Sequence, residues 1–139
     1  MECIERLDNM TRINVGVDPS ELCDQHLVAE YRELPRLWNF QAKSRPPQQF
    51  KLGSGHVLWC AQYQGMLADR YVALVAEMRA RGFSVSYPEP PSGKLNGLRP
   101  SDKTIQGARP IILKRLAERY KTMKKPPRWT MKKPPRTKR

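Results

Sequence analysis

The sequence places a carboxylate, Glu33, beside Arg32 and three residues before Arg36. Arginine side chains neutralise phosphate groups, whereas a carboxylate can transfer a proton or stabilise positive charge that develops at a sugar carbon. This combination is suited to chemistry beside a nucleic-acid backbone. Exposed helix faces also carry Arg and Glu for solubility alone, so the pattern by itself does not separate the two interpretations.

A second reactive group exists if translation begins at Met10. Removal of that methionine, which the small Thr11 permits, leaves Thr11 as the N-terminal residue. A free α-amine has a pKa near ~8, far below that of Lys, so a useful fraction is unprotonated and nucleophilic at neutral pH. Residues 1–9 are acidic on balance, unlike the rest of the chain, and we expect them to be a non-native or misassigned extension. Their retention would acylate the Thr11 nitrogen and abolish this chemistry.

The charge balance favours an anionic partner. The 139 residues suffice for one domain with a core and a tail, and 26 Lys and Arg against 13 Asp and Glu give a net charge of +13. Nucleic acid is the first candidate, and an anionic membrane surface is its competitor. No stretch approaches the ~18 apolar residues of a membrane span, and the N-terminus lacks the apolar middle of a signal peptide. We therefore expect a soluble, cytoplasmic, DNA-associated monomer.

The cysteine and histidine spacing does not support a metal site. The three cysteines are an odd number without C-x-x-C spacing, and only two histidines accompany them. We expect the cysteines to be reduced and to act as small apolar residues. Any chemistry is then expected to need no metal and no other cofactor.

A helix must position Glu33. The run 18–21, Asp-Pro-Ser-Glu, is typical of a helix start, and Pro35 favours an end near Leu34. At 100° per residue the apolar side consists of Cys23, Leu27, Tyr31 and Leu34, with Val28 at its edge. The opposite face gathers Gln25, His26, Ala29, Arg32, Glu33 and, if the turn continues, Arg36.

Two further helices complete the expected domain. Apolar residues recur at helical spacing over 56–81, before Gly82, and again over 109–120, with Pro110 near the start. Between them, seven prolines and glycines in 83–107 predict a long surface loop. No strand pattern is present. The sequence therefore predicts an all-α fold, a single compact three-helix domain over 10–121 with long loops.

The C-terminal segment 122–139 contains a literal repeat of Thr-Met-Lys-Lys-Pro-Pro-Arg, at 122–128 and 130–136. It has too little apolar surface to offset its ordering entropy, so we expect a basic tail that is disordered alone. Its cations can follow phosphates, and Trp129 between the repeats can stack on a base. The alternative is a solvated tail that only raises nonspecific affinity.

Several short runs of residues near the N-terminus form a specific pattern. They read Met10-Thr11-Arg12-Ile13-Asn14, Ser20-Glu21-Leu22, Asp24-Gln25-His26-Leu27 and Ala29-Glu30-Tyr31-Arg32-Glu33-Leu34-Pro35-Arg36. Weaker matches follow at 52–57 and 81–83. Together they closely resemble the phage endonuclease V family of pyrimidine-dimer DNA glycosylases, over roughly a third of the chain.

The resemblance implies an all-helical enzyme that repairs double-stranded DNA containing cyclobutane pyrimidine dimers or abasic sites. In that family the N-terminal threonine amine attacks C1′, expels the base and forms an imine, which drives β-elimination of the 3′ phosphate. The nucleotide opposite the lesion is extruded. By matching motif, Thr11 supplies the nucleophile and Glu33 the assisting carboxylate. The DNA-contacting positions correspond to Arg12, Gln25, Arg32 and Arg36, with His26 beside them.

Two alternatives stay open. The aromatic-rich C-terminus of the family is replaced here by the repeated basic tail with Trp129 alone, which leaves an abasic-site lyase without dimer selectivity possible. The other alternative is a noncatalytic basic nucleic-acid-binding protein whose main contact is the tail.

Overall fold

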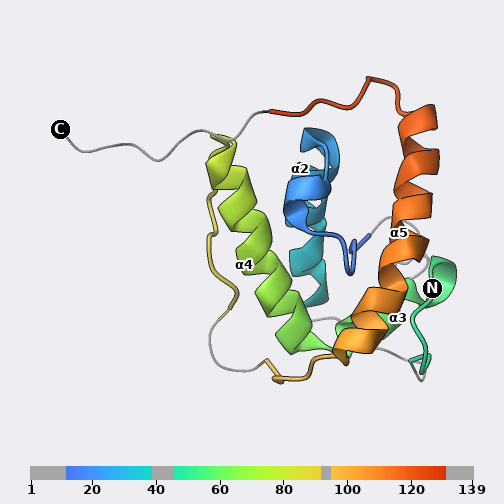
Figure 1. Ribbon diagram of the computed structural model, residues 1–139. Coiled ribbons are helices and arrows are strands. Elements are labelled where there is room, and N and C mark those ends of the chain that lie inside the picture. The colour runs from blue at the N-terminus through green and yellow to red at the C-terminus, as the bar shows by residue number, and fades with distance from the viewer. Residues whose placement is uncertain (1–11, 39–45, 92–94, 131–139) are drawn as a thin grey trace.

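The computed structural model describes residues 12–38, 46–91 and 95–130 (Figure 1). Its α-helices are α2 (Asp24–Glu33), α3 (His56–Ala61), α4 (Gln64–Ala80) and α5 (Asp102–Thr122), and its 3-10 turns are η1 (Pro19–Glu21), η2 (Leu34–Leu37) and η3 (Gly53–Gly55). These residues contain no strand, and three of their helices are long, which confirms the predicted all-α class. None of these helices is both long enough and apolar enough to cross a membrane.

The capping box predicted at Asp18 is present, but it begins a 3-10 turn rather than the long helix. Leu22 is extended, and α2 starts only at Asp24. Arg81 explains the interruption, because its guanidinium donates hydrogen bonds to the Leu22 carbonyl at 2.7 Å and to the Pro19 carbonyl at 3.3 Å. Carbonyls that would continue a helix are therefore bonded to a side chain.

The helix predicted over 56–81 is divided into α3 and α4. Tyr63 has non-helical backbone angles, and the Gly65 amide donates to the Leu98 carbonyl at 3.0 Å. A side chain at Gly65 would bring its Cβ within 2.8 Å of the Gly97 carbonyl carbon and oxygen. Gly65 thus permits the segment before α5 to pack closely against the start of α4.

The third helix begins earlier than predicted, at Asp102 rather than near residue 109. Ser101 caps it by accepting from the Thr104 amide at 3.1 Å, and Pro110 lies inside the helix. Of the prolines and glycines in 83–107, Gly107 therefore lies inside α5, and the others precede it. Among the apolar residues of this helix, Ile112 and Leu116 are buried, whereas Leu113 is 37 % exposed.

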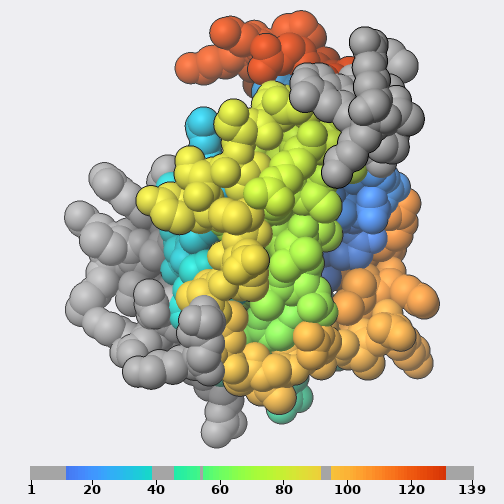
Figure 2. Space-filling view, turned by 90° about the vertical axis from the view of Figure 1, so that its left-hand side faces the viewer, coloured from blue at the N-terminus to red at the C-terminus, as the bar shows by residue number. Residues whose placement is uncertain are grey.

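The core lies between α2, α4 and α5, with α2 in the middle (Figure 1). Its fully buried residues include Leu27, Leu34, Leu67, Leu74, Ile112 and Trp59. The segment 83–91 runs along the outside of α4 (Figure 2), where the Tyr87 carbonyl accepts a hydrogen bond from Tyr71. Residues 123–130 leave α5 and cross above the start of α2 toward the end of α4 (Figure 1).

Candidate active site and nucleic-acid interface

The segment that follows Thr11 is held by two side chains from different elements. The Arg12 amide donates to Glu33 Oε1 at 3.0 Å, and the Ile13 amide donates to His56 Nε2 at 3.0 Å. Thr11, the predicted nucleophile, lies outside the described residues. Because Glu33 binds the amide of the next residue, its carboxylate is fixed beside the peptide unit that joins Thr11 to the fold.

A buried polar cluster continues this attachment at Asn14. Its side-chain amide donates to Glu30 Oε1 at 2.7 Å, and its Oδ1 accepts from Arg115 Nη2 at 3.2 Å. Glu30 is 1 % exposed and also forms an ion pair with Arg70. The cluster therefore ties the N-terminal segment to α2, α4 and α5 at once.

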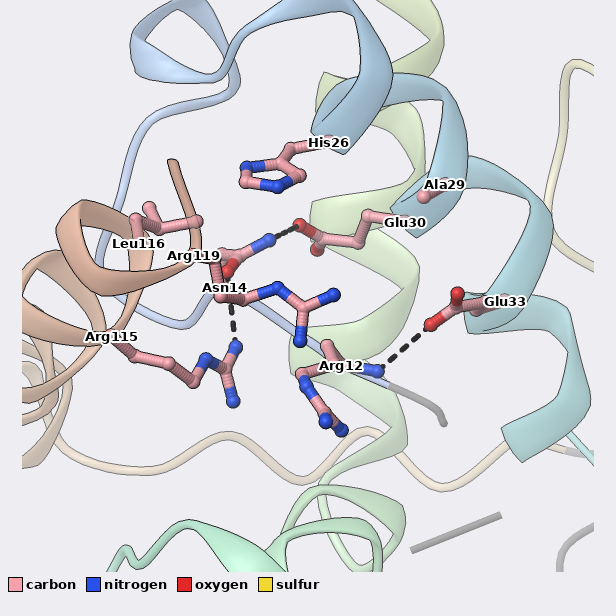
Figure 3. Close-up of a pocket in the computed structure, with 9 residues that line it drawn as sticks. All are labelled: Arg12, Asn14, His26, Ala29, Glu30, Glu33, Arg115, Leu116 and Arg119. Carbon is pink, nitrogen blue, oxygen red and sulfur yellow. Dashed lines mark hydrogen bonds between the residues drawn. The ribbon is translucent and has the colours of Figure 1, made fainter. Parts of the chain in front are cut away.

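These contacts border a narrow pocket of about 50 Å³ between α2 and α5 (Figure 3). Its lining residues are Arg12, Asn14, His26, Ala29, Glu30, Glu33, Arg115, Leu116 and Arg119. We refer to it as the Glu33 pocket. Three of the residues predicted from the sequence, Arg12, His26 and Glu33, meet there.

Glu33 is half-buried, and its surroundings suit proton transfer. Burial raises its pKa, against the opposing effects of the Arg12 amide and of the Arg36 and Arg12 charges. A carboxyl group whose pKa is raised toward neutrality can accept a proton and return it, which an ordinary exposed glutamate does less readily at neutral pH. Carboxylates with this property are typical of catalytic sites.

Cations surround the pocket on the side facing α5. Burial, together with the charges of Arg12 and Arg119, lowers the pKa of Arg115 to about 10. Burial and the Arg119 charge likewise lower the pKa of Arg12. Both guanidinium groups remain charged at neutral pH, so the pocket concentrates positive charge that an anion such as a phosphate would relieve.

His56 is 1 % exposed and acts as an acceptor. Burial and the Arg115 charge lower its pKa to about 4, so the ring is neutral at physiological pH and its Nε2 can accept from Ile13. His56 is the first residue of α3, and the group that it bonds is the backbone of the N-terminal segment.

His26 joins the pocket to an aromatic row on the surface. Its ring stacks on Tyr120 at a centroid distance of 5.2 Å, and Tyr120 meets Trp129 edge to face at 6.4 Å. Burial and the charges of Arg119 and Arg115 lower the pKa of His26. Trp129 is 53 % exposed, so one large aromatic surface near the pocket faces solvent.

The remaining predicted contact residues of α2 and η2 do not line the Glu33 pocket, although the Arg36 charge acts on Glu33. Gln25 bonds residues 126 and 128 through both ends of its side-chain amide. Arg32 is exposed and lines a different surface depression, and Arg36 is exposed on η2. The residues predicted to share one helix face are therefore distributed over four places: the Glu33 pocket, the contact with residues 126 and 128, the depression lined by Arg32, and η2.

Arg32 borders an aromatic groove formed with η2 and the segment 87–91. Its other lining residues are Tyr31, Pro35, Trp38, Tyr71, Tyr87, Glu89 and Pro91. Tyr31 and Tyr71 stack at 5.6 Å, and Trp38 meets Tyr71 edge to face at 5.7 Å. Flat rings beside an arginine can stack on a base and hold its phosphate. The aromatic groove is thus a second candidate contact with nucleic acid.

Sequence reasoning missed four pocket residues, Asn14, Glu30, Arg115 and Arg119. Arg115 and Arg119 are four residues apart on one helix face, a signal that was available but resembled ordinary surface charge. Nothing local indicated that Glu30 is buried, because its burial depends on Arg70, forty residues away.

The described residues form an all-helical protein with a pocket lined by three arginines and by the carboxylates of Glu30 and Glu33, and its positive charge suits a phosphate-bearing ligand. The chain belongs to the pyrimidine dimer DNA glycosylase family, whose model matches residues 10–89, more than half of the sequence. Its class of substrate is accordingly DNA. The match includes the N-terminal segment, α2, α3 and α4 and ends before α5.

Proposed function

We propose that the protein is a bifunctional enzyme, a pyrimidine-dimer DNA glycosylase that also cuts the strand as an abasic-site lyase. The observation that carries the proposal is the hydrogen bond from the Arg12 amide to Glu33, because it holds a carboxylate of raised pKa beside the chain segment that follows Thr11. We propose further that translation starts at Met10 and that the protein acts as a monomer on duplex DNA.

In the first step the unprotonated Thr11 nitrogen attacks C1′ of the damaged nucleotide. The new C–N bond forms as the glycosidic bond breaks, and the departing base leaves with that electron pair and takes up a proton. Glu33 stabilises the positive charge at the sugar and assists ring opening by moving a proton. The product is a protonated imine between Thr11 and the opened sugar.

In the second step the imine serves as an electron sink. Loss of a proton from C2′ sends electrons toward the imine nitrogen, and the C3′–O bond breaks to release the 3′ phosphate. Glu33, with its raised pKa, is suited to carry this proton. Arg12, Arg115 and Arg119 supply the positive charge that binds the adjoining phosphates.

The aromatic groove offers a binding site for an extruded nucleotide. C1′ cannot be reached inside a stacked duplex, and a dimer lowers the cost of opening because its stacking is already damaged. The rings of Tyr31, Trp38 and Tyr71 offer stacking surface, with Arg32 at the edge of the groove. We propose that the nucleotide opposite the lesion enters there.

Borohydride trapping tests the function directly. The protein beginning at Thr11 should become covalently attached to ultraviolet-irradiated duplex DNA in the presence of borohydride, and the same protein with residues 1–9 retained should not. Absence of a trapped species on both dimer-containing and abasic duplexes would overturn the proposal. Trapping on abasic DNA alone would instead favour the lyase without dimer selectivity.

A further inference from the structure

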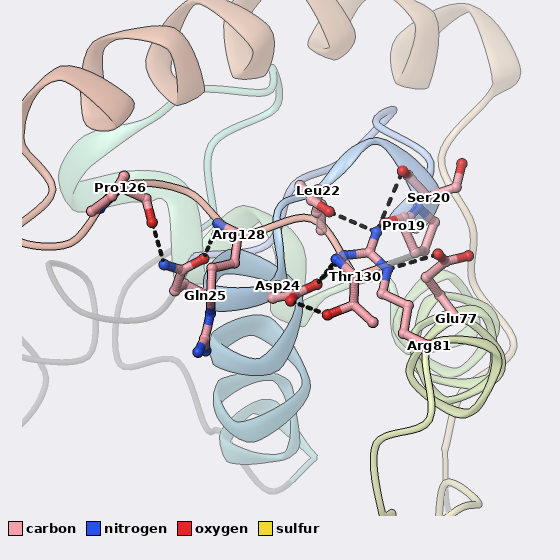
Figure 4. A network of polar contacts seen from close by, with 10 residues as sticks. All are labelled: Pro19, Ser20, Leu22, Asp24, Gln25, Glu77, Arg81, Pro126, Arg128 and Thr130. Carbon is pink, nitrogen blue, oxygen red and sulfur yellow. Dashed lines mark hydrogen bonds and ion pairs between the residues drawn. The ribbon is translucent and has the colours of Figure 1, made fainter. Parts of the chain in front are cut away.

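Residues 123–130, hereafter the strap, lie across the first turn of α2 (Figure 4). The Gln25 side chain donates to the Pro126 carbonyl and accepts from the Arg128 amide, each at 2.9 Å. The Arg128 carbonyl accepts from the Asp24 amide at 2.7 Å. Residues 126 and 128 are therefore held through their backbone groups, and the Arg128 side chain takes no part in these contacts.

The strap supplies a hydrogen-bond acceptor that the start of α2 lacks. The N-cap residue of α2, Cys23, makes no capping hydrogen bond, so the first amides of the helix lack the usual side-chain acceptor. The Arg128 carbonyl supplies an acceptor to the first of them. The strap thus replaces an N-cap that the local sequence does not provide.

A buried ion network fixes the far end of the strap. Asp24 accepts from both the amide and the hydroxyl of Thr130, and it pairs with Arg81 at 2.9 Å. Arg81 also pairs with Glu77 at 2.9 Å (Figure 4). The strap is consequently connected to α4 as well as to α2.

The cations of the strap are exposed beside the pocket. Lys124, Lys125 and Arg128 have exposed side chains. Trp129 meets Tyr120, which stacks on His26 in the wall of the Glu33 pocket. Arg128 and Trp129 are therefore anchored near the wall of the pocket, and Lys124 and Lys125 precede them in the same exposed segment.

Gln25 distinguishes two ways of binding DNA. The family resemblance assigns this position to DNA contact, yet both ends of its amide are bonded to the strap. We propose that the strap contacts the phosphate backbone of duplex DNA flanking the lesion through Lys124, Lys125 and Arg128, and that Gln25 is a positioning residue that holds the strap. This proposal rests on the proposed function for the identity of the duplex.

Salt dependence of binding to an undamaged duplex tests the surface. Each neutralised phosphate contributes about 0.9 to the slope of log affinity against log salt, so Lys124→Gln/Lys125→Gln should lower the slope by about 1.8. The control Lys103→Gln/Lys114→Gln removes the same charge from exposed positions of α5 and should leave the slope nearly unchanged. Equal slopes for both double variants would overturn the proposal.

A double-mutant cycle tests the role of Gln25. Gln25→Ala should weaken binding severalfold in the wild-type background and have little further effect when Lys124 and Lys125 are already replaced, because it acts through them. Independent, multiplicative losses would show that Gln25 contacts DNA itself and would reject the positioning role. Thermal unfolding of each variant identifies any loss that reflects misfolding.

The two proposals fail separately. Binding of the strap is measured on undamaged DNA and requires no turnover, whereas the enzyme reaction is measured by trapping on damaged DNA. Loss of trapping with a normal salt slope would reject the enzyme and keep the strap surface. Normal trapping, together with a salt slope that the strap variant does not change, would keep the enzyme and reject the strap surface.

Discussion

The two ends of α2 carry carboxylates in opposite situations. At the first turn, Asp24 is 2 % exposed; burial acts to raise its pKa, but hydrogen bonds from Thr130 and Arg81 outweigh that effect and lower it. At the last turn, Glu33 is half-buried, and burial raises its pKa despite one backbone hydrogen bond and nearby arginines. Helix α2 thus carries one carboxylate that favours its charged form, Asp24, and a second that is protonated more readily, Glu33.

The difference separates a structural from a chemical role. A carboxylate that accepts several hydrogen bonds and pairs with a buried arginine is costly to protonate, so it serves as a permanent charge. A carboxylate whose pKa is raised is easier to protonate than an ordinary glutamate, so it can take up and release a proton more readily. The opposite shifts of these two pKa values support our proposal that Glu33 serves the reaction, whereas Asp24 attaches the strap.

Glu33→Gln should have the largest effect on activity. The amide keeps the shape of the side chain but cannot transfer a proton, so strand cleavage should fall by about 10²- to 10⁴-fold. DNA affinity should change little. Wild-type cleavage should also decline as pH falls through the raised pKa of Glu33, and this limb should be absent from the residual activity of the variant.

Single-turnover cleavage and equilibrium binding, measured on the same dimer-containing duplex, check this expectation. Asp24→Asn provides the matched control at the other end of the helix, and its cleavage loss should be far smaller at a temperature where the variant is folded. Parallel loss of binding and cleavage in Glu33→Gln would make Glu33 structural.

Asp24→Asn should have the largest effect on stability. It leaves Arg81 with Glu77 as its remaining acidic ion-pair partner and should cost about 2–3 kcal/mol, below the ~3–5 kcal/mol for leaving a buried charge unpaired. Because the folded pKa of Asp24 is lowered, its stabilisation is present above the unfolded value of about 3.9 and is lost as pH falls further.

Denaturant unfolding across pH tests this assignment. The stability difference between wild type and Asp24→Asn should be greatest near neutral pH and should shrink at acid pH. A difference that is independent of pH would show that the charge of Asp24 does not contribute.

His56→Ala should have an effect on stability between those of Asp24→Asn and Thr130→Val. It leaves the buried Ile13 amide without its acceptor, at a cost of about 1–3 kcal/mol, and loosens the segment next to Thr11. Because the folded pKa of His56 is lowered to about 4, the unfolded state binds a proton first, and the residue makes the wild type less stable as pH falls from about 6.5 toward 4.

His56→Gln separates the position from the ring. Its side-chain oxygen can accept from Ile13, so it should recover part of the trapping rate lost in His56→Ala. Trapping rates of the two variants, read against their melting temperatures, check this expectation. Equal rates would leave the hydrogen bond to Ile13 without a role in the reaction.

The sequence was sufficient for the helical class because periodicity records which face is buried. It failed at the helix ends, where distant groups decide. Arg81 ends η1, the Leu98 carbonyl divides α3 from α4, and Ser101 starts α5 ahead of Gly107, which the sequence predicts to lie in the loop. Each of these contacts joins residues that local patterns cannot relate.

The candidate site divides in the same way. Glu33, Arg12 and His26 could be named because they lie in one short run of sequence, and the structure brings all three to one pocket. Arg115 and Arg119 come from α5, beyond the region of family resemblance. The contact of Gln25 with the strap spans about a hundred residues, so neither partner indicates the other.

Thr130→Val should have the smallest effect and bears on the strap end of the comparison. It removes the hydroxyl donor to Asp24 but keeps the backbone donor and the ion pair with Arg81, so the free energy of unfolding should fall by only about 1 kcal/mol. Asp24 then has fewer donors, and its pKa should rise toward the ordinary value. Carboxyl titration by NMR measures this change, with Glu33 in the same spectra as the internal control. A shift at Asp24 with none at Glu33 is expected because the two carboxylates lie at opposite ends of α2, and a joint shift would show that the strap also sets the environment of Glu33.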